Sequence, residues 1–319
     1  MKLWSRARWV AGVAILALIL LTTDVSGIGD ALSEADLGLT ALVVALNLPL
    51  LLLVSLRSRL VLASLGHDLP ASTLLSTVTL GFVAGSFTPG ASGELLRTDA
   101  LRTNAGITAH DGLALVAFER LLSFYLLVLI GGAIGAVLLL PVALAALAIV
   151  AAVALTALPA FAGPLLRHIP EPRAEPVTFW QKALSLLRRT LGRMETLLRD
   201  KGLVAAWSVV TLATFGLVAT QFWLLGKSVE GHLSYTEAVG AFAGPQLLSN
   251  LSFIPFGLGV VDGSIVGFLT SRGLTNSQAL SFAVLVRATI TLPLVIAAVA
   301  AYVHLTLQRR VAGKDASFP

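Results

Sequence analysis

The stretch FTPGASGELLR, residues 87–97, contains a proline, two glycines, a glutamate and an arginine, and it follows directly after an apolar segment. A second stretch, FIPFGLGVVD at residues 253–262, combines a proline, two glycines and an aspartate in the other half of the chain. Irregular backbone at membrane depth is tolerated only where it is buried in protein or lines a wet cavity. Carriers built from structural repeats place their substrate site between such interrupted segments. We therefore expect both stretches to line a cavity, and we assign glycines spaced by four, such as Gly81 and Gly85, to helix packing.

The residues that follow the two stretches also repeat one another. Gly106 is followed two residues later by a threonine and then, deep in an apolar run, by Arg120. Gly273 is followed at the same spacing by a threonine and by Arg287. Self-similarity at matching positions is the sequence signature of repeated structural units. The chain is therefore predicted to contain two copies of one unit.

The composition is that of a membrane protein. Of 319 residues, 56% are hydrophobic and 12% are charged, and the apolar runs show no alternation of period two. These features predict an all-α polytopic protein of the cell inner membrane or plasma membrane and argue against an outer-membrane barrel. The net charge of +5 is ordinary for such a protein, so no nucleic-acid partner is expected. Without cysteine, and with scattered histidines, the chain is expected to hold no metal and no cofactor.

Charge around the apolar segments predicts the topology. The predicted full spans are residues 9–21, 37–56, 113–139, 141–165, 203–224 and 282–303. The positive-inside rule places the basic regions 57–59 and 167–201 in the cytoplasm and the acidic loop 24–36 outside. Residues 71–104 must then enter and leave from the cytoplasm, and residues 235–272 from outside. The chain is thus predicted to have about six full spans and two re-entrant helical hairpins, arranged as inverted repeats.

This topology divides the chain. The first repeat covers residues 1–140 and the second covers residues 141–304, with a cytoplasmic tail at 305–319. A linker at residues 166–202 interrupts the second repeat. Apolar side chains recur in it at helical spacing, at Trp180, Leu184, Leu187, Leu191, Met194 and Leu198. This pattern predicts an amphipathic helix on the inner membrane surface, with a soluble linker helix as the alternative.

Charged residues inside the apolar segments are the candidate site. Each costs roughly 2.5–3.5 kcal/mol at the centre of a span, so such residues are expected to be paired, hydrated and functional. The predicted substrate-binding residues are these charges and two polar neighbours: Glu94, Arg97, Glu119, Arg120, Asp262, Arg287, Ser92 and Asn250. The three arginines suit bidentate binding of a phosphate. A purely structural ion-pair network is the alternative.

Helical spacing predicts how four of these charges pair. Glu94 and Arg97 are three residues apart, so they are expected to face one another on a helix. Glu119 and Arg120 are adjacent and point about 100° apart, so each needs a different partner.

Several of these sequence elements resemble a known family. They are residues 89–97, 119–120 and 255–262, Gly273 and Arg287. They resemble the flippase-like transmembrane region of lysylphosphatidylglycerol synthases, which also occurs as stand-alone membrane proteins. The resemblance covers about residues 37–303. Asp262 departs from it, because that family commonly has glutamate there, and the soluble aminoacyl-transferase domain is missing, so lysyl transfer is not implied. The resemblance implies movement of a phospholipid or a polyprenyl-phosphate-linked lipid between leaflets.

Other functions remain as alternatives to this carrier. The chain is expected not to be an enzyme, because an intramembrane serine protease using Ser92 would need a histidine within the bilayer. A lipid-linked transferase is the stronger rival, since Glu94, Glu119 and Asp262 offer a base or Mg²⁺ ligands. A non-transporting partner of a lipid-synthesis complex is the third possibility. The expected partner is a membrane lipid, and a homo-oligomer is left open.

Overall fold

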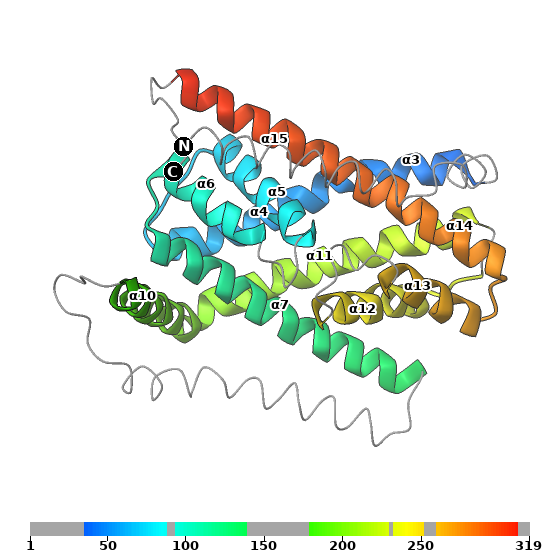
Figure 1. Cartoon of the computed structure of the whole chain (residues 1–319). Coiled ribbons are helices and arrows are strands. Elements are labelled where there is room, and N and C mark those ends of the chain that lie inside the picture. Colours follow the sequence, from blue (N-terminus) through cyan, green and yellow to red (C-terminus); the bar gives the residue numbers. More distant parts are fainter. Residues whose placement is uncertain (1–34, 88–92, 139–178, 230–231, 252–259, 312–319) are drawn as a thin grey trace.

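The computed structural model describes residues 35–87, 93–138, 179–229, 232–251 and 260–311, which form helices joined by short turns (Figure 1). The helices are α3 (Leu37–Ala45), α4 (Asn47–Ser64), α5 (Ala71–Phe87), α6 (Leu95–Ala105), α7 (Ala109–Leu138), α10 (Phe179–Arg199), α11 (Lys201–Ser228), α12 (Tyr235–Leu251), α13 (Val260–Ser271), α14 (Asn276–Val286), the π-helical turn η3 (Arg287–Thr291) and α15 (Leu292–Val311). The described part of the chain contains no strand, which agrees with the predicted all-α class.

Four stretches of helix among the described residues are long and apolar enough to cross a membrane: Leu37–Ser64, Ala109–Gly131, Lys201–Ser228 and Asn276–Gln308. They coincide with four of the predicted spans. The other two predicted spans, residues 9–21 and 141–165, lie outside the described residues. A shorter apolar helix, Ala71–Gly85, lies where the first hairpin was predicted.

Two helices extend beyond the predicted spans. Helix α4 continues past Leu56 to Ser64, so the two arginines that follow the predicted span lie within the helix. The last apolar stretch begins at Asn276 rather than at Phe282, because Thr275 caps it there. Both helices therefore extend further than hydropathy alone indicates.

Polar residues at the helix starts explain where several helices begin. The Asp36 side chain accepts hydrogen bonds from the first turn of α3, and Asp200 accepts one from Leu203 N of α11 at 3.0 Å. Thr275 and Gln278 form a reciprocal capping box at the start of α14. Each cap satisfies backbone N–H groups that have no partner within the helix.

Two pairs of helices occupy the segments that were predicted as hairpins. Helix α5 packs along α6, and α12 packs along α13. The first pair also contacts α7 and α15, and the second contacts α7, α11 and α14. The residues that join each pair, 88–92 and 252–259, lie outside the described part, and Ser92 lies among them. Both pairs are therefore components of the helix bundle, and their re-entrant path stays a prediction.

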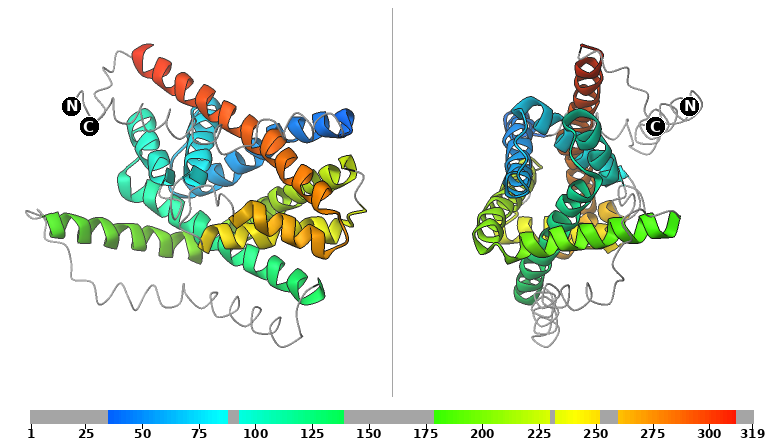
Figure 2. Two further views of the ribbon diagram at one scale, coloured as in Figure 1. Left: turned by 45° about the vertical axis from the view of Figure 1, so that its right-hand side comes forward. Right: turned by 90° about the vertical axis from the view of Figure 1, so that its left-hand side faces the viewer.

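Helix α10 lies across one end of the bundle. In Figure 1 it is seen nearly end-on, whereas the right-hand view of Figure 2 shows it lengthwise, so it runs across the direction of α11. It packs against α7, and it leaves Trp180, Leu184 and Leu187 exposed. The predicted amphipathic helix is confirmed as a helix, and this exposed apolar stripe suits an interfacial position.

The last apolar stretch is interrupted by η3, which the sequence did not predict. A second interruption, at Leu46 between α3 and α4, lies against it, because Asn47 Nδ2 donates to the Thr289 carbonyl at 2.7 Å. Pro49 contributes to this second break, since it has no N–H to bond the carbonyl four residues earlier. The two breaks thus meet, and a polar side chain from one satisfies a carbonyl of the other.

Candidate functional site

Charged residues of α6 and α7 form two ion pairs between these helices. Arg97 Nη2 lies 2.7 Å from Glu119 Oε2, and Arg120 Nη2 pairs with Glu94 Oε1. The expected local pairing of Glu94 with Arg97 is therefore wrong. Both side chains reach across to α7 instead, where the adjacent Glu119 and Arg120 point in different directions. The prediction that these two need different partners is confirmed.

The pair of Arg97 with Glu119 is enclosed by protein. Their side chains are 1% and 3% exposed, and Ser58 Oγ of α4 donates to Glu119 Oε1 at 2.8 Å. The Glu119 carboxylate thus receives one bond on each oxygen. A buried ion pair is tolerated when the geometry is good and further hydrogen bonds satisfy the remaining lone pairs. This pair fixes α6, α7 and α4 against one another.

The pair of Arg120 with Glu94 lies at the open side of the same cluster. The Arg120 side chain is 39% exposed, whereas the Glu94 side chain is 5% exposed. Glu94 Oε2 and Arg120 Nε are buried and have no hydrogen-bond partner among the described residues. This pair therefore keeps unused hydrogen-bonding capacity next to an accessible guanidinium.

Two glycines of α5 make room for these charges. A Cβ atom at Gly81 would lie 2.4 Å from Arg97 Cβ, and one at Gly85 would lie 2.7 Å from Glu94 Cγ. Such distances are too short for real carbon atoms, so only glycine fits. Both glycines do permit close packing, as expected, and their packing partners are the charged side chains of the site.

Arg57 is a member of this cluster that the sequence prediction missed. Arg57 as a whole is only 8% exposed, and its guanidinium lies over the Trp207 ring, 5.6 Å from the ring centre. It is within electrostatic range of Glu119 and Glu94. Together with Arg59 it seemed to mark the end of a span, where arginines commonly extend to the interface. No signal in the sequence separates it from that ordinary role, because Trp207 lies on a distant helix.

In the C-terminal half, Arg287 and Asp262 form an ion pair among the described residues. Arg287 Nε and Nη2 donate to the two carboxylate oxygens of Asp262 at 2.9 and 3.0 Å, a bidentate arrangement. The Arg287 side chain is 16% exposed and the Asp262 side chain is 32% exposed. Arg287 also opens the π-helical turn η3. Such turns occur frequently at functional sites. Asn250 lies in α12, and its side chain is outside the described part.

The two halves share local geometry as well as sequence. Gly106 and Gly273 both have a positive φ, 68° and 96°, at the turns that precede α7 and α14. Arg120 pairs with an acid 26 residues before it, and Arg287 with an acid 25 residues before it. A turn, a helix and an arginine paired with a preceding acid therefore recur in each half.

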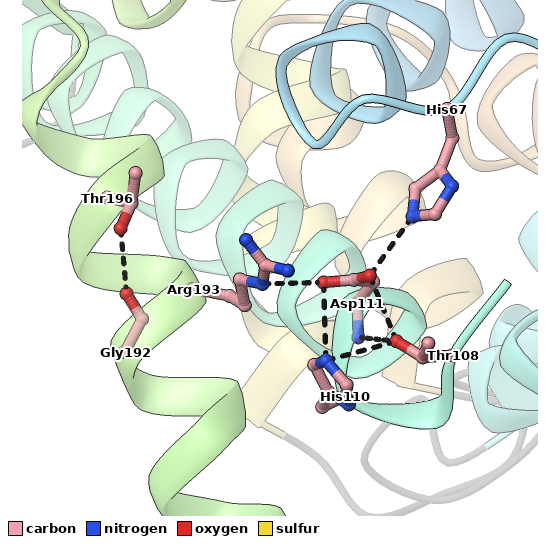
Figure 3. A network of polar contacts seen from close by, with 7 residues as sticks. All are labelled: His67, Thr108, His110, Asp111, Gly192, Arg193 and Thr196. Atoms are coloured by element: carbon pink, nitrogen blue, oxygen red, sulfur yellow. Dashed lines mark hydrogen bonds and ion pairs between the residues drawn. The ribbon is translucent and has the colours of Figure 1, made fainter.

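A separate polar cluster surrounds Asp111 at the start of α7 (Figure 3). The Asp111 side chain, 3% exposed, contacts His67 Nε2 at 3.0 Å, Arg193 Nε of α10 at 3.0 Å and the Thr108 hydroxyl at 2.9 Å. His110 lies at 3.8 Å. This cluster joins α10 and the turn before α5 to α7. No group of three or more acids and histidines suited to a metal ion occurs among the described residues.

Comparisons with known proteins identify the family of this chain. The model of the family described as the lysylphosphatidylglycerol synthase TM region matches residues 9–298. A "UPF0104 membrane protein" of Methanothermobacter thermautotrophicus is 22% identical over 299 residues, which cover 87% of this chain and 88% of that protein. The resemblance drawn from the interrupted segments and their charges is thereby confirmed. The chain belongs to the family of the lysylphosphatidylglycerol synthase TM region and is a multi-pass membrane protein.

Proposed function

We propose that this protein moves a phospholipid, or a polyprenyl-phosphate-linked lipid, between the leaflets of an inner or plasma membrane, without changing it chemically. One observation carries the proposal: each half of the chain holds a partly exposed arginine paired with a carboxylate, Arg120 with Glu94 and Arg287 with Asp262. Intramembrane ionisable residues mark substrate pathways by default.

A lipid phosphate can replace either carboxylate. A phosphate diester carries one negative charge, as a carboxylate does, and offers a guanidinium two acceptor oxygens in similar geometry. The exchange leaves the charge that faces each arginine unchanged. Each arginine then has an anionic partner whether or not lipid is bound, which avoids an unpaired guanidinium in the membrane.

We infer further that the two halves are inverted repeats that open the site to alternate faces. Arg120 and Arg287 each lie ~16 Å along the helix from the first residue of α7 and α14, at a rise of 1.5 Å per residue. The turn before α7 lies near one end of the bundle, and the turn before α14 lies near the other (Figures 1 and 2). This placement supports entry from opposite sides, as in carriers with inverted repeats.

Transport in proteoliposomes tests the proposal. Wild-type protein should move fluorescent phosphatidylglycerol between leaflets, measured by quenching the outer leaflet, and mass spectrometry should find the lipid unchanged. Arg120→Lys and Arg287→Lys keep the charge but lose the planar fork, so each should slow movement by about tenfold or more, equivalent to ~1.4 kcal/mol.

Arg102→Lys is the matched control, because Arg102 lies on α6 but is 48% exposed and pairs with Asp99. It should move lipid at the wild-type rate. Near-normal movement by both test variants, at wild-type protein levels, would show that the arginines hold helices together rather than substrate. A changed lipid mass would instead indicate a transferase.

A further inference from the structure

Arg57 stands apart from the other arginines of the cluster because no carboxylate lies within ion-pair distance of it in the described part of the chain. Arg97 and Arg120 each have one. Arg57 Nε is buried without a hydrogen-bond acceptor among the described residues, as are the Nε atoms of the other two, so the missing carboxylate is what distinguishes Arg57. Its close neighbour is the Trp207 ring, which is fully buried and is held edge-on by Phe118 at 5.7 Å. A cation over a tryptophan face is attracted by the ring but receives no hydrogen bond.

Two polar groups of α11, one of them on the Trp207 ring that Arg57 contacts, also lack partners. Trp207 Nε1 and Thr211 Oγ1 are buried and have no hydrogen-bond partner among the described residues. They are four residues apart and so lie on one face of α11, which packs against α4. The indole N–H and the Arg57 Nε–H are donors only, and the threonine hydroxyl donates as well. Buried donors without acceptors favour a ligand rich in acceptor oxygens.

The charge balance around Arg57 also favours an anionic ligand. The charged groups that act on Arg57 are Glu119 and Glu94, which attract it, and Arg97 and Arg120, which repel it. Both glutamates already pair with the other two arginines, so the cluster holds one positive charge in excess. An isolated charge away from water is strongly unfavourable, and an anion with a single charge would neutralise it.

We propose that Arg57 is the inner anion-binding residue of this site and takes a singly charged phosphate group. The inference rests on the proposed function and deepens it, since it names both the residue and the charge of the headgroup. Arg120 marks the open side of the cluster, and Arg57 marks its closed side, where Trp207 orients the guanidinium. The phosphate accepts from Arg57 and, with it, from the donors on α11. A phosphodiester lipid, which carries a single charge, is the favoured source, and free phosphate offers the same kind of acceptor oxygens.

Binding in detergent tests this assignment without requiring transport. Dioleoylphosphatidylglycerol, inorganic phosphate and dioleoylglycerol, which has no phosphate, are each titrated against the full chain by native mass spectrometry and by thermal unfolding. Wild-type protein should bind phosphatidylglycerol and gain thermal stability from it, and it should not respond to dioleoylglycerol. Arg57→Met should weaken phosphatidylglycerol binding by about tenfold or more and abolish the stabilisation. A response to inorganic phosphate that also depends on Arg57 would support the anion site and assign it to free phosphate.

The stability of the lipid-free variant separates a ligand role from a structural one. Methionine replaces an uncompensated charge with an apolar chain of similar length, so Arg57→Met should unfold at the wild-type temperature or above it. Arg59→Met is the control: Arg59 lies on α4, but its side chain is 57% exposed and contacts Asp68 at 3.6 Å. It should bind phosphatidylglycerol as the wild type does. If Arg57→Met fails to fold, Arg57→Lys decides, with a weakened affinity expected because lysine lacks the fork.

Two results would overturn the assignment: unchanged phosphatidylglycerol affinity in the folded Arg57 variants, or no response of the wild type to phosphatidylglycerol and phosphate. Failure of the proposed transport function would give a different set of results. Binding that depends on Arg57, together with no lipid movement in proteoliposomes, would leave the anion site standing and remove transport. Movement by the wild type with unchanged binding in Arg57→Met would remove only the role of Arg57.

Discussion

Glu119 is the residue on which the buried part of the cluster depends. It accepts from Arg97 and Ser58, and it is one of the two carboxylates that attract Arg57. Glu119→Gln keeps the shape but removes the charge, and it leaves buried cations uncompensated. We expect a loss of about 3–5 kcal/mol in the free energy of unfolding, measured by thermal or denaturant unfolding in detergent.

The matched control for this change is Glu195→Gln. Glu195 pairs with Arg199 at 2.6 Å on α10, where the arginine side chain is 78% exposed. Exposed pairs of this spacing contribute about 0.3–0.5 kcal/mol, so this variant should unfold nearly as the wild type does. Equal stabilities for the two variants would show that the buried pair does not hold the helices.

At the same scale, sequence reasoning identified the charged residues but not all of their partners. The divergence of Glu119 and Arg120 follows from helix geometry and was predictable. Glu94 does not pair with Arg97, because spacing along one helix does not reveal that another helix brings competing charges closer. Arg57 was missed for the same reason, since its burial is caused by packing between α4 and α11. Contacts between distant elements decide which charges meet.

At the scale of elements, the close approach of α5 to α6 can be tested at Gly85. A Cβ there would lie 2.7 Å from Glu94 Cγ and 3.0 Å from Arg120 Nη2, so Gly85→Ala must displace the pair. Overpacking of this kind costs about 1–3 kcal/mol. We expect a lower unfolding temperature and slower lipid movement. Gly192→Ala is the control, because a Cβ at Gly192 within α10 would contact nothing within 4 Å.

The control should be neutral or stabilising by up to ~1 kcal/mol, since alanine has the higher helix propensity. A Gly85→Ala variant with the stability and transport rate of the wild type would mean that α5 moves away from the pair at little cost. The glycine spacing was predictable as a packing signal, whereas the charged identity of the packing partner was not.

Sequence alone also failed to predict the breaks within the long apolar helices. The π-helical turn at Arg287 leaves hydropathy unchanged, so no apolar window detects it. Its support comes from Asn47, which lies 242 residues earlier in the chain and donates to its Thr289 carbonyl. Because a backbone carbonyl in the membrane needs a partner, two breaks that face each other can persist where a single one would be costly. Such mutual support between distant segments has no local sequence signature.

At the scale of the whole molecule, hydropathy and loop charge predicted most of the described architecture. Four predicted spans coincide with long apolar helices, and helix pairs occupy both hairpin segments. These features follow from segment length and from proline and glycine positions, which are local properties. The orientation of the two halves depends instead on counting crossings through the whole chain, including residues 139–178, which the structure does not describe. It therefore requires its own experiment.

The natural absence of cysteine makes that experiment direct. Ala105, the last residue of α6, and Ser277, in the first turn of α14, are both exposed, and neither closes a cap. In the inverted arrangement, Ala105→Cys should react with a membrane-impermeant thiol reagent only from the cytoplasm, and Ser277→Cys only from outside. Thr196→Cys on the exposed face of α10 provides the cytoplasmic reference. Labelling of Ala105→Cys and Ser277→Cys from the same side would exclude hairpins that enter from opposite faces. Both arginines would then be reached from one face, which would also exclude alternating access through the two hairpins.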